Sequence, residues 1–533
     1  MIKRRSLWAL VVVVTCSVVG SAAWGQDDSA QQSADGPQSS PQQPVPAYGP
    51  TTAPIMSENP PISGLDLPNL EPHGAPLSYL QPGAHVSESI DSNIQNELGG
   101  SSTQSLTRAE GSLELHRLWS NYDLALDYLG GVGYYNVKGI GLRQVEELGF
   151  EQKVTWKRGE LAVRDAFSYQ PEGTFGGSYG SVGTTGAGLE GASTFFGGTE
   201  LGSLGQVPRV MNLSLVDVVE NLTPKSAITV TGGYGFVHYL QNLNDNLAVA
   251  TSPIVTGSSF IGSSQVSGQL GYSRVLGPRD QAALVYGYQG FLFSTGVTFH
   301  SHVIQAMWGH RISGRMDFLA GVGPQFTQFN HVPTPITNPT KYDTIPPCVF
   351  ASTSQYPFAE ICPENSFSIS AAGRLALRYK FPKTSLSLFY DHYLTSGSGF
   401  FAGAKSDIVR FSADRPLNRV WSLVTDIGYA RNDRAISLSL SQLSTCAALA
   451  QKDGGNASSL CPGVTANTYQ YGFAGFGVHR MFGRNFHGYA SYQFNELVFD
   501  GTYCRSGGSC SLTSQRQVGT VGLDWLPRPT RLD

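Results

Sequence analysis

Charge is scarce in this sequence. Lysine, arginine, aspartate and glutamate make up 14% of the 533 residues, against about 25% in soluble domains. The 35 basic and 39 acidic residues give a net charge of −4, which excludes a nucleic-acid binder that depends on a basic surface. No apolar run after residue 25 reaches the roughly 18 residues of a spanning helix, so a polytopic helical membrane protein is excluded. The 41% of hydrophobic residues can still bury a core, which argues against a fully disordered chain.

The first 25 residues have the order of a secretory signal. Lys3, Arg4 and Arg5 precede a short apolar stretch, and small residues follow it. We predict cleavage before Gln26 or, alternatively, after Ala23. Removing three positive charges leaves 32 − 39 = −7 for the exported chain.

Residues 26–80 contain six acidic residues and no lysine or arginine, and they are crowded with proline, glutamine and serine. Such a composition cannot bury enough apolar surface to offset the entropy of ordering. We predict a disordered periplasmic tether, which is either a bare spacer or an arm that binds a partner.

From residue 81 to 526 the dominant pattern has a period of two. Between residues 366 and 381, apolar side chains such as Phe367 and Ile369 occupy one parity. Serine, arginine and lysine occupy the other, among them Arg374 and Arg378. In a strand these two sets point to opposite faces of the sheet.

Short connections such as 119–121, 312–314 and 482–484 alternate with long ones. The long ones cover about 172–208, 239–262, 330–365, 432–466 and 501–513. This alternation predicts an all-β protein, an antiparallel transmembrane barrel of about 18 strands with short periplasmic turns and long extracellular loops. The barrel spans residues 81–526, opens with a strand at His85–Ile94, and is followed by a tail at 527–533. Its predicted location is the bacterial outer membrane, with membrane lipid and the barrel-assembly machinery as partners.

Six cysteines remain after the signal is removed, and they fall in three of the predicted long loops. Six cysteines can pair in about 15 ways, but local pairing within each loop is the simplest arrangement. An exported chain can oxidise them, whereas a zinc site would need closer spacing. The candidate disulfides are Cys348 with Cys362, Cys446 with Cys461, and Cys504 with Cys510.

The sequence resembles the beta-barrel porin-2 group of bacterial outer-membrane proteins, particularly acidobacterial members. The resemblance depends on the signal, the Pro/Gln-rich leader, the opening segment 86–94, and the segments 116–119 and 122–128. It implies an outer-membrane barrel with a porin-like role and brings no catalytic residues. The chain departs from the common pattern at its end, where a short tail follows Trp525.

A barrel of this size leaves an aqueous lumen, whose selectivity depends on charged side chains along its wall. Arg374 and Arg378 share one strand face and form either part of a basic ladder or ordinary cross-strand ion pairs. The predicted pore-lining residues are Arg108, Glu110, Glu114, Asp123, Asp127, Glu147, Glu151, Lys153, Arg374, Arg378, Lys380, Arg410 and Asp426.

Other motifs are weak. Gly176–Gly180 matches the nucleophile-elbow pattern without a strand-to-helix context. His300 and His302 share a strand face, but no third metal ligand is evident. We therefore predict no enzyme, no cofactor and no bound metal, and we regard the glycine-rich segment 173–205 as the best constriction candidate.

These observations favour a porin-like channel for passive diffusion of small hydrophilic solutes. Two alternatives remain open, namely an export barrel for polysaccharide and a plugged barrel with a structural or adhesive role. A partner that docks on the acidic tether would favour export.

Overall fold

The structure, a computed structural model, describes most of the barrel-forming part of the chain. It covers residues 78–93, 103–136, 141–170, 209–240, 262–294, 296–336, 349–351, 359–381, 383–395, 403–435, 468–499 and 513–532. The chain divides into the units Met1–Ala47 and Tyr48–Asp533, and every described residue belongs to the second. The predicted signal peptide and the tether as far as residue 77 lie outside the described residues.

The described residues form twenty strands and no helix. Their bounds are β1 Tyr79–Asp91, β2 Gln104–Leu118, β3 Tyr122–Tyr135, β4 Gly141–Trp156, β5 Gly159–Gln170, β6 Arg209–Thr223, β7 Ser226–Tyr239, β8 Ser263–Val275, β9 Asp280–Phe293, β10 Thr298–Ser313, β11 Met316–Ile336, β12 Val349–Ala351, β13 Ala359–Phe381, β14 Thr384–Thr395, β15 Ala404–Pro416, β16 Trp421–Arg434, β17 Thr468–Phe482, β18 Phe486–Phe499, β19 Thr513–Trp525 and β20 Thr530–Arg531. Among these residues, none belongs to a helix long and apolar enough to cross a membrane.

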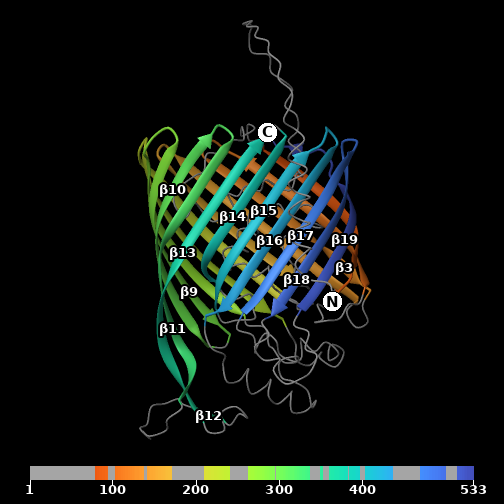
Figure 1. Cartoon of the computed structure of the whole chain (residues 1–533). Coiled ribbons are helices and arrows are strands. Elements are labelled where there is room, and N and C mark those ends of the chain that lie inside the picture. The colour runs from red at the N-terminus through yellow and green to blue at the C-terminus, as the bar shows by residue number, and fades with distance from the viewer. Residues whose placement is uncertain are drawn as a thin grey trace, which may run out of the picture. The chain divides into compact units, whose positions relative to one another are not determined.

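Eighteen strands close into one antiparallel ring (Figure 1). Each pairs with the next along the chain, β11 pairs with β13, and β1 pairs with β19 to close the ring. The short strand β12 lies on β13 outside this order, and β20 pairs with the first two residues of β1. The predicted 18-stranded antiparallel barrel is therefore confirmed.

The first strand begins at Tyr79, earlier than the predicted His85. The sequence hides this start, because Pro82 and Gly83 interrupt the apolar alternation there. Proline is tolerated in strands where a ladder partner is missing. Pairing between β1 and β19 begins only at Ala84, so the missing N–H of Pro82 costs no bond on that side. The predicted tail contributes β20, whose Thr530 and Arg531 pair with Leu80 and Tyr79.

The hairpin of β11 and β13 extends into the segment predicted as the loop 330–365. Pairing continues from Val332 with Glu364 to Ile336 with Glu360, and the extension projects beyond the other strands in Figure 1. Pro333 and the proline at 335 hide this strand in the sequence, because proline interrupts strand patterns.

The exterior of the ring is mainly apolar. Val322, Phe367, Ile369 and Val521 are each more than 60% exposed, and all point away from the barrel interior. Side chains exposed on a membrane barrel contact lipid, which favours such residues. Glu88 interrupts this face on β1, where it accepts a hydrogen bond from Thr107 Oγ1 at 2.5 Å.

Eight short connections lie at one end of the ring, which we call the turn rim. They join β2 to β3, β4 to β5, β6 to β7, β8 to β9, β10 to β11, β13 to β14, β15 to β16, and β17 to β18. Because neighbouring strands are antiparallel, all eight connections lie at the same end as the C-terminal end of β19. The other end is called the opposite rim, and the predicted long loops there lie largely outside the described residues.

Candidate functional site

All thirteen predicted pore-lining residues lie on the interior-facing side of their strands. On β2 to β4 this follows from register, because interior Glu114 pairs with Asp127, and Leu129 pairs with Glu147. On β13, Arg374 and Arg378 alternate with exterior apolar residues. Their role in lining an open pore stays a prediction.

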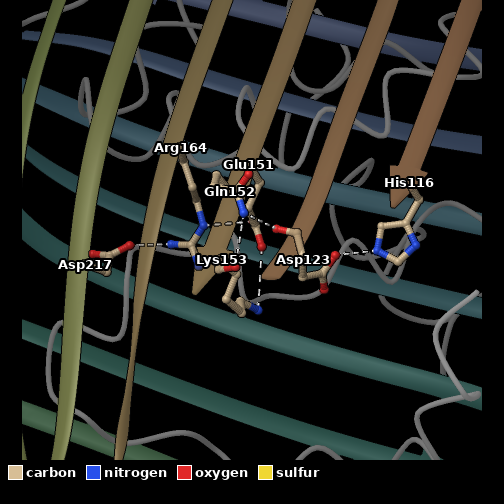
Figure 2. A network of polar contacts seen from close by, with 7 residues as sticks. All are labelled: His116, Asp123, Glu151, Gln152, Lys153, Arg164 and Asp217. Carbon is tan, nitrogen blue, oxygen red and sulfur yellow. Dashed lines mark hydrogen bonds and ion pairs between the residues drawn. The ribbon is translucent and has the colours of Figure 1, made fainter. Parts of the chain in front are cut away.

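A first polar network connects the interior faces of β2 to β6 (Figure 2). Arg164 lies at its centre, donating from Nε to Glu151 at 3.0 Å and from Nη1 to Asp217 at 2.5 Å. Lys153 Nζ lies 3.6 Å from Glu151 Oε1 on the same strand. The side-chain exposures of Arg164 and Asp217, 18% and 4%, show that this network is only slightly open to water.

Gln152 links this network to β3, because its Nε2 donates to the backbone oxygen of Asp123 at 3.2 Å. His116 Nε2 lies 2.6 Å from Asp123 Oδ1, and Tyr79 of β1 donates from its hydroxyl to Glu114. Glu114 and Asp127 are direct cross-strand partners, and like charges at such positions repel each other. Acidic side chains therefore predominate on this arc of the wall.

A second set of interior charges, on β11 to β16, forms separate ion pairs. Arg378 Nε donates to Asp317 at 3.0 Å, and Arg374 Nε donates to Asp391 at 2.8 Å. Each of the two arginines predicted as a possible ladder thus has its own aspartate. The geometry agrees with the alternative of cross-strand ion pairs.

Arg410 and Asp426 form the bidentate pair of this set. Arg410 donates from Nε at 3.0 Å and from Nη2 at 2.7 Å to the two carboxylate oxygens. Such forked contacts fix geometry better than single bonds. The wall near β13 to β16 is therefore charged and locally neutral.

Sequence reasoning missed Arg164, Asp217, Asp317 and Asp391. On β5, Arg164 and Asp165 are adjacent charges on opposite faces, so the alternation gives no sign of which one points inward. The structure turns Asp165 outward, where it accepts hydrogen bonds from Asn212 and Ser214. Asp391 lies between Tyr390 and His392, and the same ambiguity arises there.

Buried contacts close the interior seam between the first and last strands. Arg516 Nη2 lies 2.5 Å from Asp91 Oδ2, and His85 Nδ1 lies 2.9 Å from Asp524 Oδ1. His85 Nε2 also contacts Ser112 Oγ at 2.8 Å. Since breaking a buried ion pair leaves a costly unpaired charge, these contacts favour the closed ring.

Part of the interior is apolar, which the sequence pattern did not predict. The side chains of β9 and β10 near the opposite rim form a cluster, with Phe291 and Phe299 at a ring distance of 4.5 Å. We call this cluster the apolar clasp, and its members are Phe291, Phe293, Val297, Phe299, Phe329, Leu394 and Ala435. It connects the β9–β10 hairpin with residues from the ends of β14 and β16.

Interior side chains also differ in exposure along the barrel. At the turn rim, Asp123 is 33% exposed, and Arg410, further along the wall, is 40% exposed. Near the opposite rim, Tyr135, Arg209 and Tyr469 are at most 1% exposed. Asp317 and Asp524 at the turn rim are also buried, at 3% and 1%, so exposure varies from strand to strand at both ends of the described wall.

The remaining predicted features give less information. His300 and His302 lie on the exterior face, where their Nδ1 atoms contact the hydroxyls of Tyr288 and Tyr286 at 2.8 Å. The described residues contain no group of three or more potential metal ligands. The segment 173–205, with its Gly176–Gly180 match, lies outside the described residues. So do five of the disulfide candidates, and Cys362 is described as backbone only.

The closed ring, its apolar exterior and its charged interior define the molecule as a transmembrane β-barrel. No protein-family model matches the sequence, and no curated protein matches it. Solved structures with a similar strand arrangement include OccK2 (OpdF) from Pseudomonas aeruginosa, 7% identical, with a TM-score of 0.37 over 84% of this chain and 97% of that chain.

Two further structures illustrate the range of this likeness. The outer membrane protein OpdK from P. aeruginosa is 8% identical, with a TM-score of 0.36 over 84% of this chain and 98% of its own. The ferric-catecholate import receptor Fiu from E. coli is 7% identical, with a TM-score of 0.38 over 84% and 81%. Likeness at this level assigns neither family nor function to the chain.

Proposed function

We propose that the chain is a porin-like channel of the bacterial outer membrane through which small hydrophilic solutes diffuse passively. One observation carries this proposal, namely the division of the closed ring into an apolar exterior and an interior rich in ionised side chains. Barrels of 16 to 18 strands are wide enough to leave an aqueous lumen. A charged wall keeps such a lumen wet, and lipid requires the apolar exterior.

The thirteen predicted residues, together with Arg164, Asp217, Asp317 and Asp391, would line the solute path. The acidic arc on β2 to β4 supports a weak preference for cations. The paired charges on β11 to β16 add little selectivity, because their signs compensate. The resemblance of the opening segments to the beta-barrel porin-2 group agrees with the same role. Secretion by a cleaved signal, and disulfides in the loops, belong to this proposal.

A plugged barrel is the second candidate, favoured by the buried interior residues near the opposite rim. The apolar clasp lies at that rim, where it would narrow the lumen. Export of polysaccharide has less support, because a long polymer needs a wide path through both rims.

Single-channel recording from the protein refolded into a planar bilayer tests the proposal. We expect stable current steps, and Phe299→Ala in the apolar clasp should raise their amplitude. The control is Phe476→Ala, which removes an exposed exterior ring and should leave the amplitude unchanged. Absence of steps from protein shown to be folded by heat-modifiable gel mobility would contradict an open channel and favour the plugged barrel.

A further inference from the structure

The turn rim is strongly basic. Seven of its eight short connections contain a lysine or arginine, and none contains an acidic residue. The connection at 119–121 lacks a cation, but Arg117 precedes it on β2. The cations within the connections are Lys157, Arg158, Lys225, Arg279, Arg315, Lys383, Arg419 and Arg484.

Aromatic rings next to the connections indicate the depth of the membrane interface. They stack against two further arginines on the adjoining strand ends. The guanidinium of Arg480 lies 5.1 Å from the ring centre of Trp421 and 4.8 Å from that of Phe482. Arg117 lies 5.0 Å from the ring centre of Trp119. Tryptophan favours the boundary between lipid chains and headgroups, so these cations lie beside the headgroup layer.

The ring of cations is only slightly offset by acidic side chains, as at Arg279, which interacts electrostatically with Asp280. Within the described residues, none of the eight connection cations forms an ion pair with a carboxylate. Two exterior acids near this rim contact other side chains, although Asp280 also follows Arg279 directly and contacts His310 Nδ1 at 2.8 Å. Glu220 accepts a hydrogen bond from Trp156 Nε1 at 2.7 Å, and Asp280 accepts one from Trp308 Nε1 at 3.2 Å.

The opposite rim has a different arrangement, in which charges of both signs lie together on the exterior. Arg431 pairs with Asp433 at 3.2 Å, and Asp407 contacts His392 at 2.7 Å. Among the residues that the structure describes, the unbalanced positive charge lies at the turn rim. It favours an anionic partner that can surround the whole ring.

We propose that the turn rim binds the phosphate-bearing headgroups of anionic phospholipids in the leaflet that surrounds it. The inference rests on the proposed membrane location of the barrel. Arginine and lysine form charge-assisted hydrogen bonds with phosphate oxygens, and basic clusters at a membrane surface recruit anionic lipid. The cations are distributed around the ring, which matches a lipid annulus better than a single compact ligand.

The tryptophans provide a reporter at this rim. Five of the seven follow residue 25, and all five lie at or near the turn rim: Trp119, Trp156, Trp308, Trp421 and Trp525. Brominated phospholipids quench the fluorescence of tryptophans that they contact. The full protein can therefore be compared in bilayers that contain brominated phosphatidylglycerol or brominated phosphatidylethanolamine.

We expect phosphatidylglycerol to bind at least about threefold more strongly than phosphatidylethanolamine at low salt. The preference should fall as salt rises, because salt screens exposed charges. A variant that neutralises five connection cations should lower the ratio to about one. It carries Arg158→Gln, Lys225→Gln, Arg279→Gln, Arg315→Gln and Arg484→Gln. The control, Lys405→Gln with Arg431→Gln at the opposite rim, should keep the wild-type ratio.

Equal quenching of the wild-type protein by both lipids would overturn the inference without any variant. A five-site variant that folds, by gel mobility, and keeps the preference would also overturn it. Loss of binding to isolated peptidoglycan in that variant, with an unchanged lipid preference, would assign the ring to the cell wall instead. Absence of quenching by brominated phosphatidylcholine would refute the membrane location itself, whereas missing channel currents alone would leave the lipid site standing.

Discussion

Arg164 Nη1 donates to Asp217 Oδ2 at 2.5 Å, which joins β5 to β6 on the interior wall of the barrel. The aspartate side chain is 4% exposed, so the arginine supplies most of the charge compensation that water would otherwise provide. The same guanidinium binds Glu151 on β4, and one cation therefore holds three consecutive strands together.

Arg164→Gln should destabilise the barrel by about 3 kcal/mol, because it leaves a buried carboxylate without its cation. The measurement is urea unfolding in lipid vesicles, followed by tryptophan fluorescence. The matched control is Arg431→Gln, which breaks an exposed exterior pair and should cost less than about 1 kcal/mol. Equal effects of the two variants would show that the Arg164 network has no special structural role.

Glu114→Gln combined with Asp127→Asn should make the channel less cation-selective by about twofold, because charged wall residues set ion preference. These carboxylates face each other across β2 and β3 on the interior wall. The reversal potential in a salt gradient measures the change.

The control is Glu146→Gln on β4, whose side chain lies on the exterior face next to interior Glu147. It should leave the reversal potential unchanged. A larger shift from Glu146 than from the interior pair would contradict the assignment of the two faces.

Gly403→Ala should lower stability by about 2 kcal/mol, because two separate costs add. The backbone has a φ of +94°, and a Cβ would lie 3.1 Å from Phe299 Cε1. Gly483 separates the two costs, since its φ is +74° and no atom lies within 4 Å of a Cβ there. Gly483→Ala should cost about 1 kcal/mol from backbone conformation alone. Equal losses in thermal unfolding of the two variants would mean that contact with Phe299 adds nothing.

Peptide mapping without reduction should recover three local disulfides, Cys348–Cys362, Cys446–Cys461 and Cys504–Cys510. An exported chain meets oxidising conditions, and closing short loops limits their freedom in the unfolded state. Cross-loop pairs, or six free thiols in protein isolated from the envelope, would refute this pairing.

The sequence by itself determined the class of fold. On β13, apolar residues such as Phe367 alternate with polar residues such as Arg374, and the period of two assigns each side chain to one face without knowledge of its neighbours. Repeated along the chain, with short turns between runs, this local signal gave the antiparallel barrel and its 18 strands. Where two adjacent residues are both charged, as at Arg164 and Asp165, the alternation does not show which of them faces the interior.

The tertiary structure decided which residues meet. Asp91 binds Arg516 and Phe299 lies against Gly403, although these partners are far apart in the sequence. Such pairs depend on the register of strands that meet only when the ring closes, and no local pattern encodes that register. The apolar clasp and the basic connections of the turn rim have the same origin. Each becomes a surface only when separate strands or connections are brought to one end of the barrel.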